Sequence, residues 1–276
     1  MIITMAINYA SKYAAQIDER FSREAFSTGA VNQDYDFVGV KTVNVYSIPT
    51  AKMNDYSKTG ANRYGTPEEL ENSVQELTMS QDRSFTFTID RGNYTDTQMV
   101  NAAGAALQRQ LREVVVPEID TYRFAKICAS AGTTATGAIT KTNAYDAFLD
   151  GTTALVDNKV PTAGAVAYVS SAFYKLIKLD PAFIKQSDMS QNIAMKGQIG
   201  MIDGIPLVVL PASYMPEGVS FFVTNKIATT APVKLSEYKI HDNPPGLNGW
   251  LVEGRVYHDA FVLENKKKAI YVHKTA

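Results

Sequence analysis

The chain has 276 residues, of which 45% are hydrophobic and 20% charged, as in ordinary folded proteins with a sizeable core. Its formal net charge of −1 excludes the global basic field of a nucleic-acid-binding protein, and its single cysteine, Cys128, excludes an internal disulfide. No segment has the roughly 18 apolar residues of a membrane span or the pattern of a signal peptide, so we expect a soluble protein made in a cytoplasm, without membrane contact.

Residues 6–26 place Tyr9, Tyr13 and Ile17 at helical spacing, which predicts a short amphipathic helix or arm at the amino-terminus. Two interpretations of its apolar face are open: the segment packs on its own domain, or it contacts another copy of the chain. The turn-rich residues that follow end this segment.

Two strands are expected next, from Phe37 to Ile48 and from Leu77 to Ile89. In the second, Phe85 and Phe87 alternate with serine and threonine, which is typical of a half-buried strand. Between the strands lies Pro49 to Val74, a polar connection that is unusually long for the inside of a compact domain. We therefore expect the two strands to pair and to form an extended hairpin arm that needs a partner surface.

The longest expected element is a helix from Thr95 to Ala131, which begins with the capping-box spacing of Thr95 and Gln98. Apolar or small side chains recur along one face: Met99, Ala103, Leu107, Leu111, Val114 or Val115, Ile119 and Tyr122. Polar side chains, among them Asp120 and Arg123, are assigned to the opposite face. Pro117 predicts a kink, and a rod of roughly 50 Å requires an elongated body to lie across.

The connector from Ser130 to Asn143 is rich in glycine, threonine and alanine and marks a domain boundary. Asn143 is expected to cap a helix, and Asp203-Gly204 to form the tight turn of a hairpin within Gly197–Pro211. The other expected elements are a strand at 164–170, a helix capped by Ser171, and strands at 219–223, 249–256, 260–263 and 269–273. Together these patterns predict an α+β protein with two lobes and a protruding hairpin.

Motifs of catalysis are missing from the sequence. Residues 132–137 have the spacing of a phosphate loop, but Ala138 and Ile139 stand where lysine and serine or threonine are required. The three histidines lack the spacing of a metal site, and Lys266–Lys268 is expected to be a solvated turn. We therefore expect no enzyme activity, no cofactor and no metal.

The order of these parts resembles the major capsid proteins of tailed bacteriophages, which have the Hong Kong 97-type fold. The matching stretches are Phe37–Asp90 for that family's extended loop and Thr95–Ala131 for its long spine helix. Within the helix, REVVVPEIDTYRFAK at Arg112–Lys126 looks like the family's spine-end sequence. GQIGMIDGIPLVVLP at Gly197–Pro211 is similar to a hairpin seen in many members, and the resemblance covers nearly the whole chain.

The resemblance implies an α+β fold with an N-terminal arm, an extended β-hairpin loop, a spine helix in a peripheral domain, and an axial domain. The implied division is 1–36 for the arm, 37–92 for the loop and its flanking strands, 93–131 for the spine helix, 132–235 for the axial domain and 236–276 for the strands that return to the peripheral domain.

The resemblance also implies a major capsid protein of a phage or prophage, which self-assembles through pentamers and hexamers into an icosahedral shell. Its implied partners are itself, a separate scaffolding protein, a portal and, weakly and non-specifically, packaged double-stranded DNA. Assembly is implied in the host bacterial cytoplasm, with the virion as the final location. Rim-type contacts between subunits are assigned to Lys52, Asp55, Lys58, Arg63, Glu68, Glu69, Glu71, Tyr9 and Tyr13.

Other protein classes fit parts of the sequence. The nearest is an encapsulin, a cellular nanocompartment shell with the same fold; the long excursion from Phe37 to Ile89 favours a phage, whereas the amphipathic Tyr9–Phe21 stretch also fits an encapsulin's cargo-binding helix. A phage tail or neck assembly protein would form rings or tubes. An enzyme with a cleft near residue 132 would require clustered titratable groups.

Overall fold

A computed structural model describes residues 25–35, 37, 41–48, 50–67, 69, 73–92, 102–185 and 200–275. Tyr9, Tyr13, Glu68, Glu71 and the expected helix start at Thr95 lie outside these residues. The chain divides into two compact units, one formed by Met1–Asp36 with Ser80–Ala276 and the other by Phe37–Met79.

The larger unit contains a six-stranded sheet with the strand order β4-β13-β8-β5-β7-β6. Its strands are β4 (Thr133–Thr136), β5 (Ala165–Ser170), β6 (Met201–Ile202), β7 (Ile205–Leu210), β8 (Val219–Asn225) and β13 (Ile270–Lys274). β13 lies inside the sheet, parallel to β4 and antiparallel to β8. Every residue of β8 is buried, as expected of a strand that is covered on both faces.

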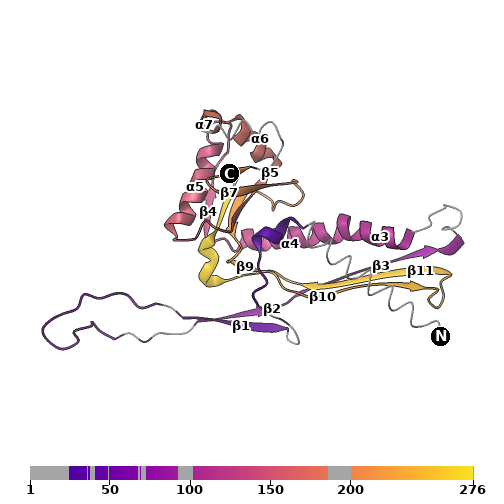
Figure 1. Ribbon diagram of the computed structural model, residues 1–276, viewed down its shortest axis with the longest axis horizontal. Coiled ribbons are helices and arrows are strands. Elements are labelled where there is room, and N and C mark those ends of the chain that lie inside the picture. The colour runs from indigo at the N-terminus through magenta and orange to yellow at the C-terminus, as the bar shows by residue number, and fades with distance from the viewer. Residues whose placement is uncertain are drawn as a thin grey trace. The chain divides into compact units, whose positions relative to one another are not determined.

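Helices α5 (Ala144–Asp157), α6 (Ser171–Leu179) and α7 (Pro181–Lys185) accompany this sheet (Figure 1). The ring of Phe221 from β8 lies 4.5 Å from that of Phe173 in α6 and 5.9 Å from that of Phe148 in α5. Burial of rings of this size is a main source of the free energy that holds helices on a sheet.

Two helix caps differ in detail from the sequence prediction. The side chain of Ser170, one residue before the expected Ser171, accepts a hydrogen bond from the backbone N–H of Phe173 at 3.2 Å. Asn143 precedes α5 as expected, but its side chain makes no cap hydrogen bond. Asp180 caps the first turn of α5 instead: its carboxylate accepts a hydrogen bond from the backbone N–H of Tyr145 at 3.0 Å.

A second sheet of the larger unit has the order β10-β11-β3, all antiparallel. It consists of β3 (Gln81–Asp90), β10 (Val233–Asp242) and β11 (Gly249–His258). Its apolar face packs on the long helix through one cluster: Leu107, Leu111, Ile119, Tyr238, Val252 and Val256, with Phe85 and Phe87 partly buried against them.

The long helix runs without a break through α3 (Ala102–Gln110), a π-helical turn η2 (Leu111–Val115) and α4 (Val116–Ala129) (Figure 1). In the π turn the backbone N–H of Val116 donates to the carbonyl of Leu111, five residues back. Pro117 follows directly and has no N–H to donate, so the irregularity expected from this proline takes the form of a π turn. Val115 packs in the cluster, whereas Val114 is 45% exposed.

The expected pairing of the strands at Phe37–Ile48 and Leu77–Ile89 holds only for Leu77 and Thr78 and is wrong for the rest of the second strand. β1 (Thr42–Ser47) pairs with β2 (Ser73–Thr78), while the strand that carries Phe85 and Phe87 is β3 and pairs with β11. The alternation identified the buried face of β3 correctly, but that face packs on the long helix and not within the arm.

Short elements complete the larger unit: η1 (Phe26–Ala30), β9 (Thr229–Thr230), β12 (Phe261–Val262) and η3 (Glu264–Ala269), a 3₁₀-helix at the expected lysine turn. β9 and β12 pair with each other. The connector after the long helix contains β4, which the sequence analysis missed because its three threonines and one alanine gave no apolar alternation.

The smaller unit consists of the β1–β2 ribbon, in register from Thr42↔Thr78 to Ser47↔Ser73, and of residues that have no regular secondary structure. A ribbon of two strands is marginal in water without further cover.

Candidate inter-subunit contact surface

The tip of the smaller unit, residues 50–67, is closed by its own backbone. The N–H of Ser57 donates to the carbonyl of Arg63 at 2.9 Å, and the N–H of Gly65 donates to the carbonyl of Asn62 at the same distance. Asn62 and Gly65 have φ values of 54° and 91°, a conformation that these two residue types adopt at least cost. The tip is therefore a turn-built loop and not a continuation of two long strands.

Exposed apolar side chains are concentrated in the smaller unit. It holds six of the eleven exposed large hydrophobic residues in the described part of the chain: Tyr46, Ile48, Met53, Tyr56, Tyr64 and Val74. Tyr46 and Val74 are a cross-strand pair, 69% and 54% exposed, and the rings of Tyr56 and Tyr64 meet edge to face at 5.0 Å. A gathering of this kind marks an interaction site, because isolated domains rarely leave it uncovered.

The charged residues that the sequence analysis assigned to contacts are solvent-facing where the structure describes them: Lys52, Asp55, Lys58, Arg63 and Glu69 are all exposed. Arg63 donates from Nε to the carbonyl of Gly60 at 3.3 Å, which leaves the rest of its guanidinium outward. Among the described residues, Lys52, Asp55 and Lys58 have no ion-pair partner. Charges of this type suit the rim of an interface, where they set register more than affinity.

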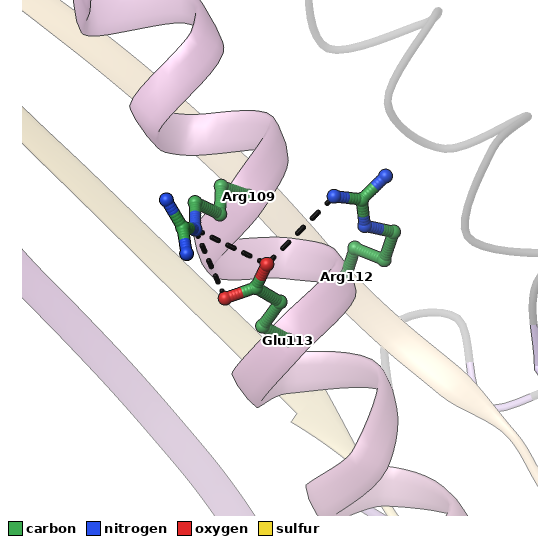
Figure 2. A network of polar contacts seen from close by, with 3 residues as sticks. All are labelled: Arg109, Arg112 and Glu113. Carbon is green, nitrogen blue, oxygen red and sulfur yellow. Dashed lines mark hydrogen bonds and ion pairs between the residues drawn. The ribbon is translucent and has the colours of Figure 1, made fainter.

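The outer face of the long helix carries a second charged group (Figure 2). Glu113 accepts hydrogen bonds from Nε of Arg109 at 3.0 and 3.1 Å, and Nη2 of Arg112 lies 3.7 Å from the same carboxylate. All three side chains are at least 47% exposed, so the pairs contribute little to stability. Together these three residues, two arginines and one glutamate, carry a net charge of +1.

Asp120 and Arg123, which the sequence analysis placed on the outer face, are buried at 0% and 4% exposure. The carboxylate of Asp120 accepts from the backbone N–H groups of Phe26 at 2.8 Å and Ser27 at 3.3 Å, and Arg123 donates from Nη1 to Oγ of Ser27 at 2.9 Å. Burial raises the pKa of Asp120 more than these donors and the Arg123 charge lower it. The pair fastens η1 to α4; η1 is also bonded to β5, where Tyr168 donates to the carbonyl of Phe26 at 2.9 Å.

A second buried carboxylate belongs to Asp259, which is 2% exposed. One oxygen accepts from the backbone N–H of Ser80 at 2.7 Å and from its hydroxyl at 2.9 Å. The other accepts from the hydroxyl of Tyr122 at 2.7 Å and from the N–H of Ala260 at 2.8 Å. The pKa of the Tyr122 hydroxyl is raised to about 12, mainly by burial and secondly by its hydrogen bond to the Asp259 carboxylate.

Sequence reasoning missed both carboxylates. Asp120 stands at a helical position where a polar residue normally faces water, and its partners lie more than 90 residues away in the chain. The only local signal at Asp120 is the apolar residue before it, Ile119, and this does not identify the partner of the carboxylate.

In the described part of the chain, no cluster of three or more histidine, cysteine, aspartate or glutamate residues could hold a metal ion. His258 and His273 are buried and far apart in the chain, and burial lowers the pKa of both. Cys128 is buried as expected, and burial raises the pKa of its thiol to about 12. No helix within the described ranges is long and apolar enough to cross a membrane.

A scan against models of protein families and a search of curated proteins both find no match. Solved structures are similar over almost the whole chain. A protein of Mycobacterium phage Che8 matches with 14% identity and a TM-score of 0.65, over 92% of this chain and 90% of that one. The capsid structure of the cyanophage P-SCSP1u matches with 12% identity and a TM-score of 0.67, over 90% and 85% of the two chains. The mature capsid of bacteriophage PhiM1 matches with 12% identity and a TM-score of 0.66, over 91% and 87%.

The chain has the Hong Kong 97-type capsid fold. The α+β fold class and the capsid resemblance expected from the sequence are thus confirmed. A virus-like particle from Pyrococcus furiosus is similar as well, with 10% identity, a TM-score of 0.58, and coverage of 96% of this chain and 99% of that one. In this capsid fold, α3, η2 and α4 correspond to the expected spine helix, and the β1–β2 ribbon with its tip occupies the sequence position of the extended loop.

Proposed function

We propose that this chain is the major capsid protein of a tailed bacteriophage or prophage. It self-assembles through pentamers and hexamers into an icosahedral shell that encloses double-stranded DNA. The observation that carries the proposal is the extent of the similarity to phage capsids, which spans at least 90% of this chain and at least 85% of theirs. Because the similarity to capsids accounts for nearly the whole chain, little sequence remains for a separate enzymatic domain. The protein therefore serves as a structural subunit of the virion and not as an enzyme.

In this proposal the smaller unit lies on a neighbouring subunit. Its exposed Tyr46, Ile48 and Val74 supply the apolar contact that the ribbon needs, while Lys52, Asp55, Lys58, Arg63 and Glu69 form the charged rim. Glu68, Glu71, Tyr9 and Tyr13 are assigned to the same contacts from the sequence alone. Large complementary surfaces of this kind, repeated by symmetry, are what a closed shell requires.

The division of labour follows the proposed domains. Residues 132–235 form the axial domain at the centre of each capsomer, and residues 93–131 and 236–276 belong to the peripheral domain that joins capsomers. A separate scaffolding protein and a portal act during assembly in the host cytoplasm, and the packaged DNA is held weakly and without sequence specificity.

A second candidate is the shell of a cellular nanocompartment. It is favoured by the similarity to the Pyrococcus furiosus virus-like particle, which covers 99% of that chain, although the TM-score of 0.58 is lower than those of the three phage proteins.

The proposal is tested by expressing the chain, with and without its neighbouring phage genes, and by examining the product with size-exclusion chromatography and negative-stain electron microscopy. Closed shells support it, and DNA inside particles assembled with the packaging proteins separates a phage capsid from a compartment loaded with an enzyme. Open tubes or rings, or a 30.2 kDa monomer under every condition, would contradict it.

A further inference from the structure

The two points at which the chain passes between its units are held by the same small region of the larger unit. On one side, Asn32 precedes the smaller unit, which begins at Phe37; on the other, Ser80 follows its last residue, Met79. Asn32 is hydrogen-bonded to Thr229 of β9. Ser80 is hydrogen-bonded to Asp259, which is followed by Ala260 and then by β12. Since β9 and β12 pair with each other, both attachment points belong to one platform.

The bonds at Asn32 use both backbone groups and the side chain. Its N–H donates to the carbonyl of Thr229 at 2.9 Å, and its carbonyl accepts from the N–H of Ala231 at 2.9 Å. Its side-chain amide donates to the carbonyl of Lys226 at 2.7 Å. These hydrogen bonds, together with one from the hydroxyl of Thr230 to the carbonyl of Asn32 at 3.4 Å, fix the position of the chain at Asn32.

The bonds at Ser80 converge on one carboxylate. Asp259 accepts four hydrogen bonds, two from Ser80, one from Tyr122 and one from Ala260. A charged acceptor that is 2% exposed is costly to leave unsatisfied, so these donors are held far more firmly than surface groups. Tyr122 ties the carboxylate to the long helix, within the same turn whose Asp120 and Arg123 fasten η1.

We infer that Asn32, Ser80, Tyr122 and Asp259 form a root clamp, which holds the two chain segments that lead into and out of the contact-making unit and on which the uniformity of the assembled shell depends. The inference rests on the proposed function and adds to it the residues that position the arm. These are positioning residues, because they act through the segments they hold and do not themselves lie on the contact surface. None of the four clamp residues belongs to the apolar clusters of the larger unit, although Ala30, Ala228 and Val262 of one cluster lie close to them in the chain.

The test compares Asp259→Asn with the wild type. Asparagine keeps one acceptor oxygen and turns an NH₂ group toward two donors, so half of the four hydrogen bonds are lost. In unassembled subunits we expect the amides of Ser80 and the first residues of β3 to exchange about 10- to 100-fold faster, relative to those of β8. In assembly we expect shells of mixed size, or open sheets, where the wild type forms one size.

Leu155→Ala, in the core of the six-stranded sheet, is the matched control for lost stability, and its shells should stay uniform. Tyr122→Phe and Ser80→Ala, which each remove one hydroxyl, are the milder variants to use if Asp259→Asn does not fold. The clamp is refuted if exchange at Ser80 is unchanged, if faster exchange leaves the shells uniform, or if Leu155→Ala disturbs shell size equally. If the wild type itself forms no shells, the proposed function fails, and the exchange rates alone decide whether the clamp holds Ser80.

Discussion

His258 gives the subunit a pH-dependent stability whose size follows from its surroundings. The ring is 2% exposed, its Nδ1 has no hydrogen-bond partner, and the edge of the Tyr122 ring system packs against it at a centroid distance of 5.6 Å. Burial, followed by the positive charge of Arg123, lowers the pKa of His258 from 6.5 to about 4. The folded protein therefore binds this proton less readily than the unfolded chain.

The direction in which stability changes with pH follows from the difference in proton binding between the folded and the unfolded protein. The contribution of His258 is fully present above pH 6.5 and is lost as the pH falls toward 4. A shift of this size is worth about 3 kcal/mol when complete, and about 2 kcal/mol of it is lost by about pH 5. Asp120, whose pKa is raised, acts in the opposite sense, but it is present in both proteins of the comparison below.

The assay is urea unfolding of unassembled subunits at about pH 7.5 and about pH 5. We expect His258→Gln to lose about 2 kcal/mol less than the wild type between the two conditions, because glutamine takes up no proton. His241→Gln, which removes an exposed histidine, is measured alongside as the control for the loss of a histidine side chain. Parallel pH dependence of wild type and His258→Gln would refute the reasoning.

Three further predictions concern the arm, the core and a tight backbone approach. Deleting Asn54–Asn72 should leave a soluble, folded subunit that forms no closed shells in electron micrographs, and normal shells would contradict the role of the arm. Phe221→Ala should destabilise the subunit by about 3–5 kcal/mol in chemical denaturation, because the ring is fully buried among other aromatic rings. Gly132→Ala should lower the free energy of unfolding by about 1–3 kcal/mol, since a Cβ there collides with the backbone carbonyl of Lys267. Gly137→Ala should be near neutral in the same assay, because a Cβ there meets its neighbours only at ordinary contact distance.

The sequence predicted those parts of the fold that depend on local periodicity. Leu107, Leu111 and Ile119 recur at helical spacing and do face the sheet, and Pro117 marks the place where the helix becomes irregular. Phe85 and Phe87 alternate along a strand whose apolar face is buried. In each case the apolar residues recur with the period of the helix or strand itself, so the buried face can be predicted even when the element that packs against it is unknown.

Partners across the chain could not be predicted. β3 pairs with β11, more than 150 residues later, and nothing in the alternation of Phe85 and Phe87 distinguishes that strand from β1. Asp120 was assigned to water because a periodic pattern treats every polar residue as exposed, whereas backbone N–H groups from Phe26 and Ser27 satisfy it in the interior. The exposed charged tip could be predicted from its polar composition alone. The β9–β12 platform could not, because it depends on contacts between segments far apart in the chain.

The position of β13 has a consequence for synthesis in the cell. This strand completes the six-stranded sheet between β4 and β8, so until residues 270–274 have been made both neighbours present unpaired edges. At about 5–20 residues per second, on the order of ten seconds separate the synthesis of β4 from that of β13. A chain that ends before residue 270 therefore lacks the strand that joins β4 to β8 and cannot complete this sheet.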